Sequence, residues 1–141
     1  KSTRSMGRVA LMATLTAERA LEDAGLLGDP FVKSGDMGVA YGSSSGSPSA
    51  LAEFLRMLTQ KRTEGINATT YIKMMSHTAP VNIGVYLGVT GRVVTTSSAC
   101  TSGSQGIGYA YEAVKSGRQT AMIAGGAEEL DVTQAAIFDT L

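Results

Sequence analysis

The sequence predicts a layered α/β fold with some parallel strand pairs, and three observations support this. Segments with the three- and four-residue apolar spacing of helices alternate along the chain with short runs of β-prone residues. Two of the helical segments carry a stripe of small residues, which lets another backbone approach closely. The chain has 141 residues and is 43% hydrophobic, which suits a globular unit large enough to bury a core.

The first predicted helix spans residues 6–24 and is followed by a short strand. Gly25 is a typical helix stop. Residues 36–42 form a β-prone run. The narrow face of the helix, with its alternating spacings of four and three, consists of Met6, Ala10, Ala13, Ala17, Ala20 and Ala24.

Two helical regions are predicted next. Ser47 is expected to cap a helix that has Pro48 in its first turn and the cations of residues 61–62 at its end. Residues 69–88 form a helical region that is interrupted, or begins again, near Pro80, because proline removes a donor and clashes with the preceding turn. The predicted buried stripe of the earlier helix consists of Leu51, Phe54, Leu55 and Leu58.

The rest of the chain is predicted to form a strand, a helix and a strand. Residues 91–99 form the first strand, and the composition of residues 120–127 predicts a fully buried one. Glu128 and Glu129 follow; as neighbours they point apart, so they form no acid/base pair, and one is expected to hold the turn. The helix between the strands carries small residues at Gly103, Gly106, Ala110, Ala113 and Gly117, beside larger ones at Ile107, Tyr111 and Val114.

Composition and charge limit the classes of partner. The 12 basic and 12 acidic side chains cancel, which predicts no nucleic-acid partner. No apolar run approaches the roughly 18 residues of a membrane span, and the first residues lack a signal-peptide pattern, so no membrane partner and a cytoplasmic location are predicted. The missing initiator Met and the apolar end predict that the chain is a fragment.

Cys100 is the single cysteine, so it forms neither an internal disulfide nor a multi-thiolate metal site. It is either a small buried residue or a reactive thiol. Its position between a strand and a helix favours the second interpretation, a reactive thiol, because the free N–H groups and the dipole of a helix start stabilise a thiolate. The neighbouring residues are too small to cover it. A potent nucleophile at this position would still need further help, usually from a histidine.

Ser44 is a competing candidate nucleophile, because residues 42–46 match the G-x-S-x-G pattern of a hydrolase elbow. His77 is the only histidine available as its base, and only Glu53 and Glu64 lie between them as acids. A Gly/Ser-rich turn between strand and helix is the simpler interpretation. His77 itself is more simply a hydrogen-bonded polar residue, and no nucleotide-phosphate loop pattern occurs.

Residues 94–130, which read VTTSSACTSGSQGIGYAYEAVKSGRQTAMIAGGAEEL, resemble a β-ketoacyl-acyl-carrier-protein synthase of the fatty-acid type, one of the thiolase-like condensing enzymes. The likeness extends back through YGSSSGSP at 41–48 and ALEDAGL at 20–26. It implies a five-layered αβαβα fold of two similar halves. Residues 1–141 would then be an incomplete N-terminal half, because they would contain most of that half but not all of it. It also implies that Ser44 lies in a glycine-rich turn.

The resemblance assigns roles to three residues. Cys100 would accept the acyl group from acyl-carrier protein as a thioester, and its backbone N–H would be an oxyanion-hole donor. Met75 would reach the acyl pocket of the neighbouring subunit, and Phe138 would line the pocket of its own. The strand at 91–98 would pair with its copy in a homodimer. No cofactor and no metal are implied.

In such enzymes two histidines bind the thioester carbonyl and promote decarboxylation of malonyl-carrier protein. They belong to the second half, together with a nearby lysine, and His77 matches neither histidine. The fragment alone is therefore expected to be inactive in condensation. Two alternatives remain open: a polyketide-type ketosynthase or another condensing enzyme, and a non-catalytic interaction fragment.

Overall fold

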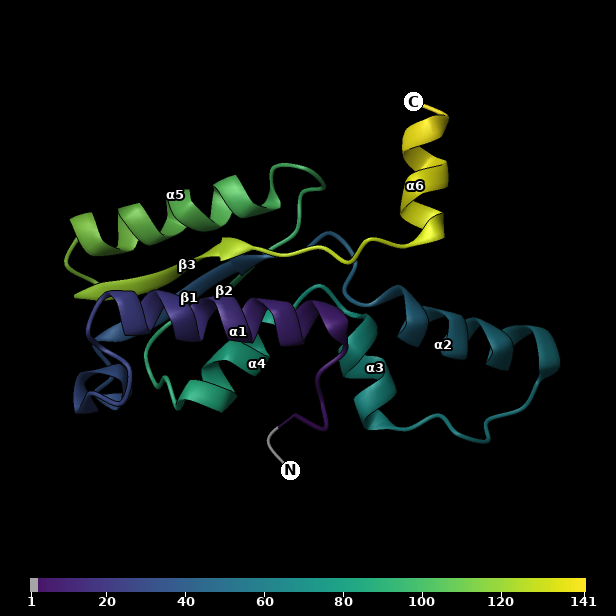
Figure 1. The fold of residues 1–141 in the computed structure, drawn as a ribbon, viewed down its shortest axis with the longest axis horizontal. Helices are drawn as coiled ribbons and strands as arrows, with labels where there is room; N and C mark the ends of the chain where they lie inside the picture. The colour runs from purple at the N-terminus through teal and green to yellow at the C-terminus, as the bar shows by residue number, and fades with distance from the viewer. Residues whose placement is uncertain (1–2) are drawn as a thin grey trace.

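The computed structural model describes residues 3–141 as a parallel sheet between layers of helices (Figure 1). The described elements, in chain order, are α1 (Arg8–Asp23), the 3-10 helix η1 (Pro30–Lys33), β1 (Met37–Gly42), α2 (Pro48–Gln60), α3 (Ala68–Met74), α4 (Thr78–Leu87), β2 (Val93–Thr96), α5 (Ser102–Lys115), β3 (Ala121–Gly126) and α6 (Val132–Asp139).

The sheet has the strand order β2-β1-β3, and both pairings are parallel. Val39 in the central strand is the register partner of Val93 in β2 and of Ile123 in β3. Helices α1 and α4 pack together on one face of the sheet, and α5 covers the other face (Figure 1). The predicted α/β class with parallel strand pairs is confirmed. No helix in the described part of the chain is long and apolar enough to cross a membrane.

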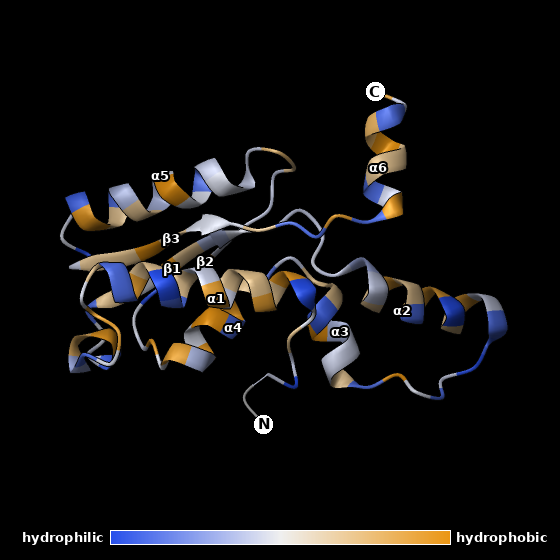
Figure 2. Ribbon diagram, viewed as in Figure 1, coloured by the Kyte–Doolittle hydropathy of each residue, from blue (hydrophilic) through white to orange (hydrophobic). Residues whose placement is uncertain are grey.

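The main core lies between the sheet and the α1/α4 layer; in Figure 2, α4 is mostly orange, whereas α1 alternates between blue and orange or tan. Val9 and Ala13 of α1 are fully buried there together with Val39 of β1 and Ile83 of α4. Ala10, Ala13 and Ala17 of the small face predicted for the first helix are buried and allow this close packing. Ala20 and Ala24 of the same predicted face are exposed.

Gly25 ends α1 as predicted, and its backbone geometry explains why. Its φ of +70° is left-handed, a region that glycine enters without a Cβ penalty. The N–H of Gly25 donates to the Glu22 carbonyl, and the N–H of Leu26 donates to the Leu21 carbonyl. These bonds satisfy carbonyls that the helix itself leaves free.

The α5 layer lies unusually close to the sheet. A Cβ added at Gly106 would meet the Ala40 carbonyl oxygen at 2.9 Å and the Gly125 oxygen at 3.0 Å. At Gly126 an added Cβ would lie 2.9 Å from the Cα of Gly103. The predicted small stripe therefore faces the sheet at Gly103, Gly106, Ala110 and Ala113, whereas Gly117 lies beyond the end of α5 and is exposed. The larger residues beside the stripe, Ile107, Tyr111 and Val114, are exposed.

The prediction of a buried stripe on α2 is wrong. Leu51, Leu55 and Leu58 are 41%, 49% and 61% exposed, and only Ala50 of α2 is buried. Helix α2 extends away from the sheet and packs mainly on α3, so its apolar face has little to cover it among residues 3–141 (Figure 1). Periodicity identified the helix and its apolar side, but not its surroundings.

The capping role predicted for Ser47 is also wrong in its detail. Ser47 is the N-cap residue of α2 and Pro48 follows it, but the Ser47 side chain forms no capping bond. Its hydroxyl instead accepts a hydrogen bond of 3.2 Å from the N–H of Val9 at the start of α1. Ser47 therefore joins two helices that lie far apart in sequence.

The fully buried strand predicted at residues 120–127 is mostly half-buried or exposed, and only Ile123 of β3 is buried. β3 is an edge strand, and in the described structure only β1 pairs with it. The strand predicted at residues 91–99 is confined to β2. The helical region at 69–88 breaks at residues 75–77, and Pro80 lies in the first turn of α4, where its missing N–H costs little.

Candidate active site

The candidate site lies where the parallel strands end. Connections leave the carboxyl ends of β1, β2 and β3 at one edge of the sheet, which is where ligands bind in open α/β folds. These connections are residues 43–47, 97–101 and 127–131. The turn between α3 and α4 joins them, because Ser76 donates a hydrogen bond of 3.0 Å to the Ser44 carbonyl.

Cys100 lies in the turn between β2 and α5, two residues before the helix begins, and it is exposed. The first-turn N–H groups of a helix lack intrahelical acceptors, so a helix start is a position at which proteins commonly bind anions. Among the described residues 3–141 none buries Cys100, which is compatible with a reactive thiol.

Polar side chains hold the Cys100 turn in place. The buried Ser102 hydroxyl donates to the Ala99 carbonyl at 2.6 Å and accepts from the Ser98 N–H at 2.8 Å. The Thr96 hydroxyl donates to the Ser102 carbonyl at 2.7 Å. Because these bonds lie on both sides of Cys100, the thiol projects from a fixed backbone.

Ala99, next to Cys100, has a φ of +53°, a left-handed value that residues with a Cβ rarely adopt. We expect Ala99→Val to lower the free energy of unfolding by about 1–2 kcal/mol or more, because a β-branched side chain is least tolerated there. Urea denaturation of the full-length protein measures this change. Ala99→Gly is the control and should retain stability; equal losses in both variants would contradict strain at this position.

Met75 is half-buried at the end of α3, next to Ser76. The Ser97 hydroxyl donates to that of Ser76 at 3.1 Å and to the Ser44 carbonyl at 3.3 Å. The structure therefore brings the turn that carries Met75 next to the turn that carries Cys100. No hydrogen bond within residues 3–141 joins Met75 itself to Cys100.

Phe138 lies on α6, which projects from the sheet (Figure 1), and is 64% exposed. It lines a cavity of about 290 Å³ together with Ser44, Glu128, Glu129, Leu130, Gln134 and Ala135. Cys100 and Met75 do not line this cavity. The structure thus places Phe138 beside the loop after β1 but does not unite the three predicted residues in one pocket.

Asp131 caps α6, because its Oδ1 accepts a hydrogen bond of 2.9 Å from the Thr133 N–H and one of 2.7 Å from the Thr133 hydroxyl. The backbone bond, and then the hydroxyl bond, lower the pKa of the Asp131 carboxyl below its ordinary value. Its contribution to folding is therefore complete above the unfolded-state pKa and is lost as the pH falls through the lower folded-state value.

We expect acid to loosen the first turn of α6, and Asp131→Asn to remove this pH dependence while keeping a cap. The amide chemical shifts of residues 133–136, followed by NMR during acid titration, measure the effect. The same acid-induced change in both proteins would show that another group is responsible.

The hydrolase arrangement considered for Ser44 is not assembled. Glu53 accepts a hydrogen bond from Thr70, and Glu64 pairs with Arg62 at 3.9 Å. In the described structure the His77 side chain forms no hydrogen bond to either glutamate or to Ser44. Ser44 lies in a strand-to-helix turn, as the simpler interpretation predicted.

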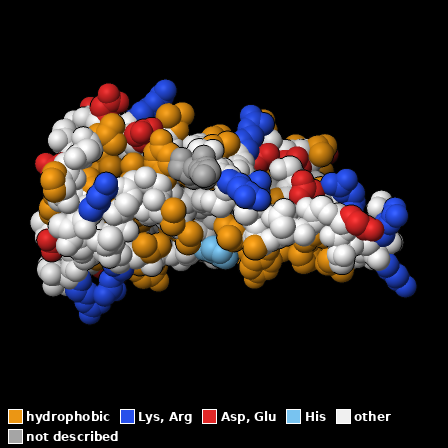
Figure 3. Space-filling view, turned by 90° about the horizontal axis from the view of Figure 1, so that it is seen from below, with side chains coloured by type: hydrophobic (Ala, Val, Ile, Leu, Met, Phe, Trp, Pro, Cys, Tyr) orange, Lys and Arg blue, Asp and Glu red, His pale blue; other side chains and the backbone are white. Residues whose placement is uncertain are grey.

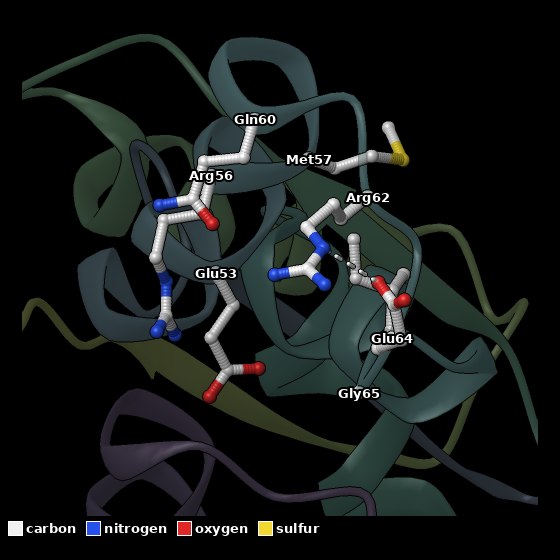
Figure 4. A pocket seen from close by; sticks show the side chains of 8 residues that line it. Glu53, Arg56, Met57, Gln60, Arg62, Glu64 and Gly65 are labelled. Carbon is white, nitrogen blue, oxygen red and sulfur yellow. Dashed lines mark ion pairs between the residues drawn. The ribbon is translucent and has the colours of Figure 1, made fainter.

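A cavity of about 480 Å³ lies between the end of α2 and the connection to α3, away from the strand ends (Figure 4). Its lining is charged and includes Glu53, Arg56, Arg62 and Glu64. No residue of the Cys100 turn lines it, so we do not place the reacting thiol there.

Sequence reasoning missed the roles of Ser76 and Ser97 and the extent of the role of Glu128. One of the paired glutamates is predicted to hold the turn that follows residues 124–127, but the Glu128 carboxylate contacts a different turn, where it accepts from the distant Ser44 N–H. The only signal was the clustering of small polar residues after each strand. Such clusters are common in loops and do not indicate their partners.

The family model for the N-terminal domain of β-ketoacyl synthases matches residues 1–140. The chain belongs to this family. It is 31% identical, over its whole length, to 3-oxoacyl-[acyl-carrier-protein] synthase 1 of Buchnera aphidicola subsp. Baizongia pistaciae, of which it covers 35%. The resemblance identified from residues 94–130 is confirmed.

Solved structures agree with this family assignment. The crystal structure of a β-ketoacyl synthase from Burkholderia phymatum STM815 matches 99% of the chain with 51% identity and a TM-score of 0.95, over 34% of its own length. A type II polyketide ketosynthase in complex with its acyl-carrier protein matches 96% of the chain, and 38% of its own, with a TM-score of 0.83 and 20% identity, which shows the fold alone. The chain spans about a third of the length of such relatives.

Proposed function

We propose that the protein containing this chain is a 3-oxoacyl-acyl-carrier-protein synthase of fatty-acid elongation, and that residues 1–141 are an incomplete N-terminal half of it. The observation that carries the proposal is the exposed Cys100 thiol in a rigid strand-to-helix turn of a β-ketoacyl synthase domain. Relatives named 3-oxoacyl-[acyl-carrier-protein] synthase 1 favour the fatty-acid type over the polyketide type.

In the proposed first step the Cys100 thiolate attacks the thioester carbonyl of acyl-carrier protein. A new C–S bond forms, the original C–S bond breaks, and the carrier leaves as a thiol after taking up a proton. The oxygen carries negative charge in the intermediate, and the Cys100 N–H at the helix start is suited to donate to it.

In the proposed second step malonyl-carrier protein loses carbon dioxide, and the resulting carbanion attacks the Cys100 thioester. A C–C bond forms and the Cys100 thiolate leaves, which returns the enzyme to its starting state. The residues described in this structure supply the thioester and its backbone support. Decarboxylation is assigned to groups outside this chain.

The proposed partners are acyl- and malonyl-carrier protein and a second copy of the complete protein. The homodimer is supported by the position of β2 at the edge of the sheet, where it can pair with another strand. Met75 and Phe138 remain proposed acyl-pocket residues, Met75 for the neighbouring subunit and Phe138 for its own. A cytoplasmic location remains a prediction from the sequence.

Mass spectrometry of the full-length protein after incubation with acyl-carrier protein tests the first step. We expect the peptide containing Cys100 to gain the mass of the acyl group, and hydroxylamine to remove it. Addition of malonyl-carrier protein should convert the adduct into a β-ketoacyl product. Binding of carrier protein without an adduct would overturn the proposal and favour a non-catalytic interaction role.

A further inference from the structure

We propose that Glu128 is a positioning residue that holds the Cys100 turn in place through the backbone of Ser44. The inference rests on the proposed function only in its kinetic consequence, because the contacts that carry it belong to the fold. Glu128 is 28 positions from Cys100 in the sequence and lies on a different connection.

The first contact joins the connections that follow β3 and β1. The Glu128 carboxylate accepts a hydrogen bond from the Ser44 N–H. A second bond, of 3.3 Å from the Gln134 side-chain amide to the Ser45 hydroxyl, joins the same two segments. In Figure 1 these connections leave the sheet at the same edge. An ionised acceptor makes the Glu128 bond stronger than a neutral one.

The second set of contacts leaves from the other side of Ser44. Its carbonyl accepts hydrogen bonds from the Ser76 hydroxyl at 3.0 Å and the Ser97 hydroxyl at 3.3 Å, and these two hydroxyls are 3.1 Å apart. One backbone residue is therefore fixed by Glu128 through its N–H and fixes two further turns through its carbonyl.

Ser97 is three residues before Cys100, and Ser76 directly follows Met75. The Ser102 bonds close the Cys100 turn on itself, and the Ser97 bonds attach the strand end of that turn to Ser44 and Ser76. A shift of Ser44 would move the acceptor shared by both hydroxyls. Because bond-forming steps are sensitive to displacements of about 1 Å, such a shift lowers the rate of acyl transfer.

The test compares Glu128→Ala with Glu128→Gln in the full-length protein, because glutamine retains an acceptor oxygen. We expect Glu128→Ala to lower kcat for acyl transfer by at least about tenfold and to leave KM for acyl-carrier protein within about twofold. Glu128→Gln should restore most of kcat. Glu22→Ala removes an exposed carboxylate at the opposite end of the sheet and should have no effect.

Amide hydrogen exchange tests the contacts without any substrate. In Glu128→Ala, exchange should rise in residues 43–47, 75–77 and 97–101 together, although Glu128 touches only the first of these segments. A rise confined to residues 43–47 and 127–131 would overturn the inference. Spread of exchange to all three segments without acyl transfer by the wild-type protein would support the network and reject the proposed function instead.

If Glu128→Ala does not fold, Ser76→Ala and Ser97→Ala test the part of the network that joins Ser44 to the Cys100 turn. Since both hydroxyls use one acceptor, the double variant should lose less kcat than the product of the two single losses. Independent, multiplicative losses would overturn the shared role of Ser44.

Discussion

Replacing Cys100 with serine in the full-length protein should lower the rate of acyl transfer by at least about 10³-fold, the largest effect we expect on activity. A serine hydroxyl is far less ionised than a thiol at neutral pH and is therefore a much weaker nucleophile. Cys100 is exposed, and serine is close to it in size, so the melting temperature should change by no more than about 2 °C.

The rate of thioester formation from acyl-carrier protein, followed by mass spectrometry, measures this effect. Ser104→Ala is a matched control, because Ser104 is an exposed residue in the first turn of α5 and its side chain forms no hydrogen bond within residues 3–141. It should retain the wild-type rate. Product formation by Cys100→Ser at a near wild-type rate would refute the role of Cys100 as nucleophile.

Replacing Gly106 with leucine should lower the free energy of unfolding by about 3 kcal/mol or more, the largest effect we expect on stability. The first added carbon alone would lie 2.9 Å from the Ala40 oxygen and 3.0 Å from the Gly125 oxygen. They are backbone atoms of the paired strands β1 and β3, so neither can move without disturbing the sheet. Helix propensity favours leucine by about 0.8 kcal/mol, which does not offset the clash.

Glu112→Leu is the matched control, because Glu112 lies on the exposed side of the same helix. Its free energy of unfolding should change by no more than about 0.5 kcal/mol. Chemical denaturation of the full-length proteins compares the two variants. Equal losses would mean that the small stripe of α5 does not face a close neighbour in the complete protein.

The exposed apolar surface shows that local sequence patterns do not determine which apolar side chains are buried. Figure 3 shows hydrophobic side chains gathered on the face below the α1/α4 layer and along the part of the molecule that holds α2 and α3. Val85 of α4 is 74% exposed, although α4 is the most apolar stretch of that layer. An apolar residue in a sequence pattern therefore predicts a preference for burial, but whether a neighbour covers it depends on the whole assembly.

The strands show a similar limit, because local composition identifies them but does not determine how they pair. Residues 91–99 and 120–127 have the composition of strands, and both contain one. Their pairing on the two sides of β1, and hence the edge position of β3, depends on how the helices cross over between them. Composition alone predicted that residues 120–127 form a fully buried strand, because composition carries no information on how many strands pair with β3.

The sequence by itself determined the α/β class, the stop at Gly25, the close packing side of α5 and the position of Cys100 between strand and helix. These features depend on spacings of a few residues, which periodicity and backbone preferences report directly. Only the tertiary structure decided that α2 is exposed, that Ser47 binds α1, and that Glu128 meets Ser44. The last of these contacts spans 84 positions, and the side chains involved are ordinary loop residues. Hydrogen bonds between distant loops depend on the relative placement of whole strands, which no local pattern of residue types contains.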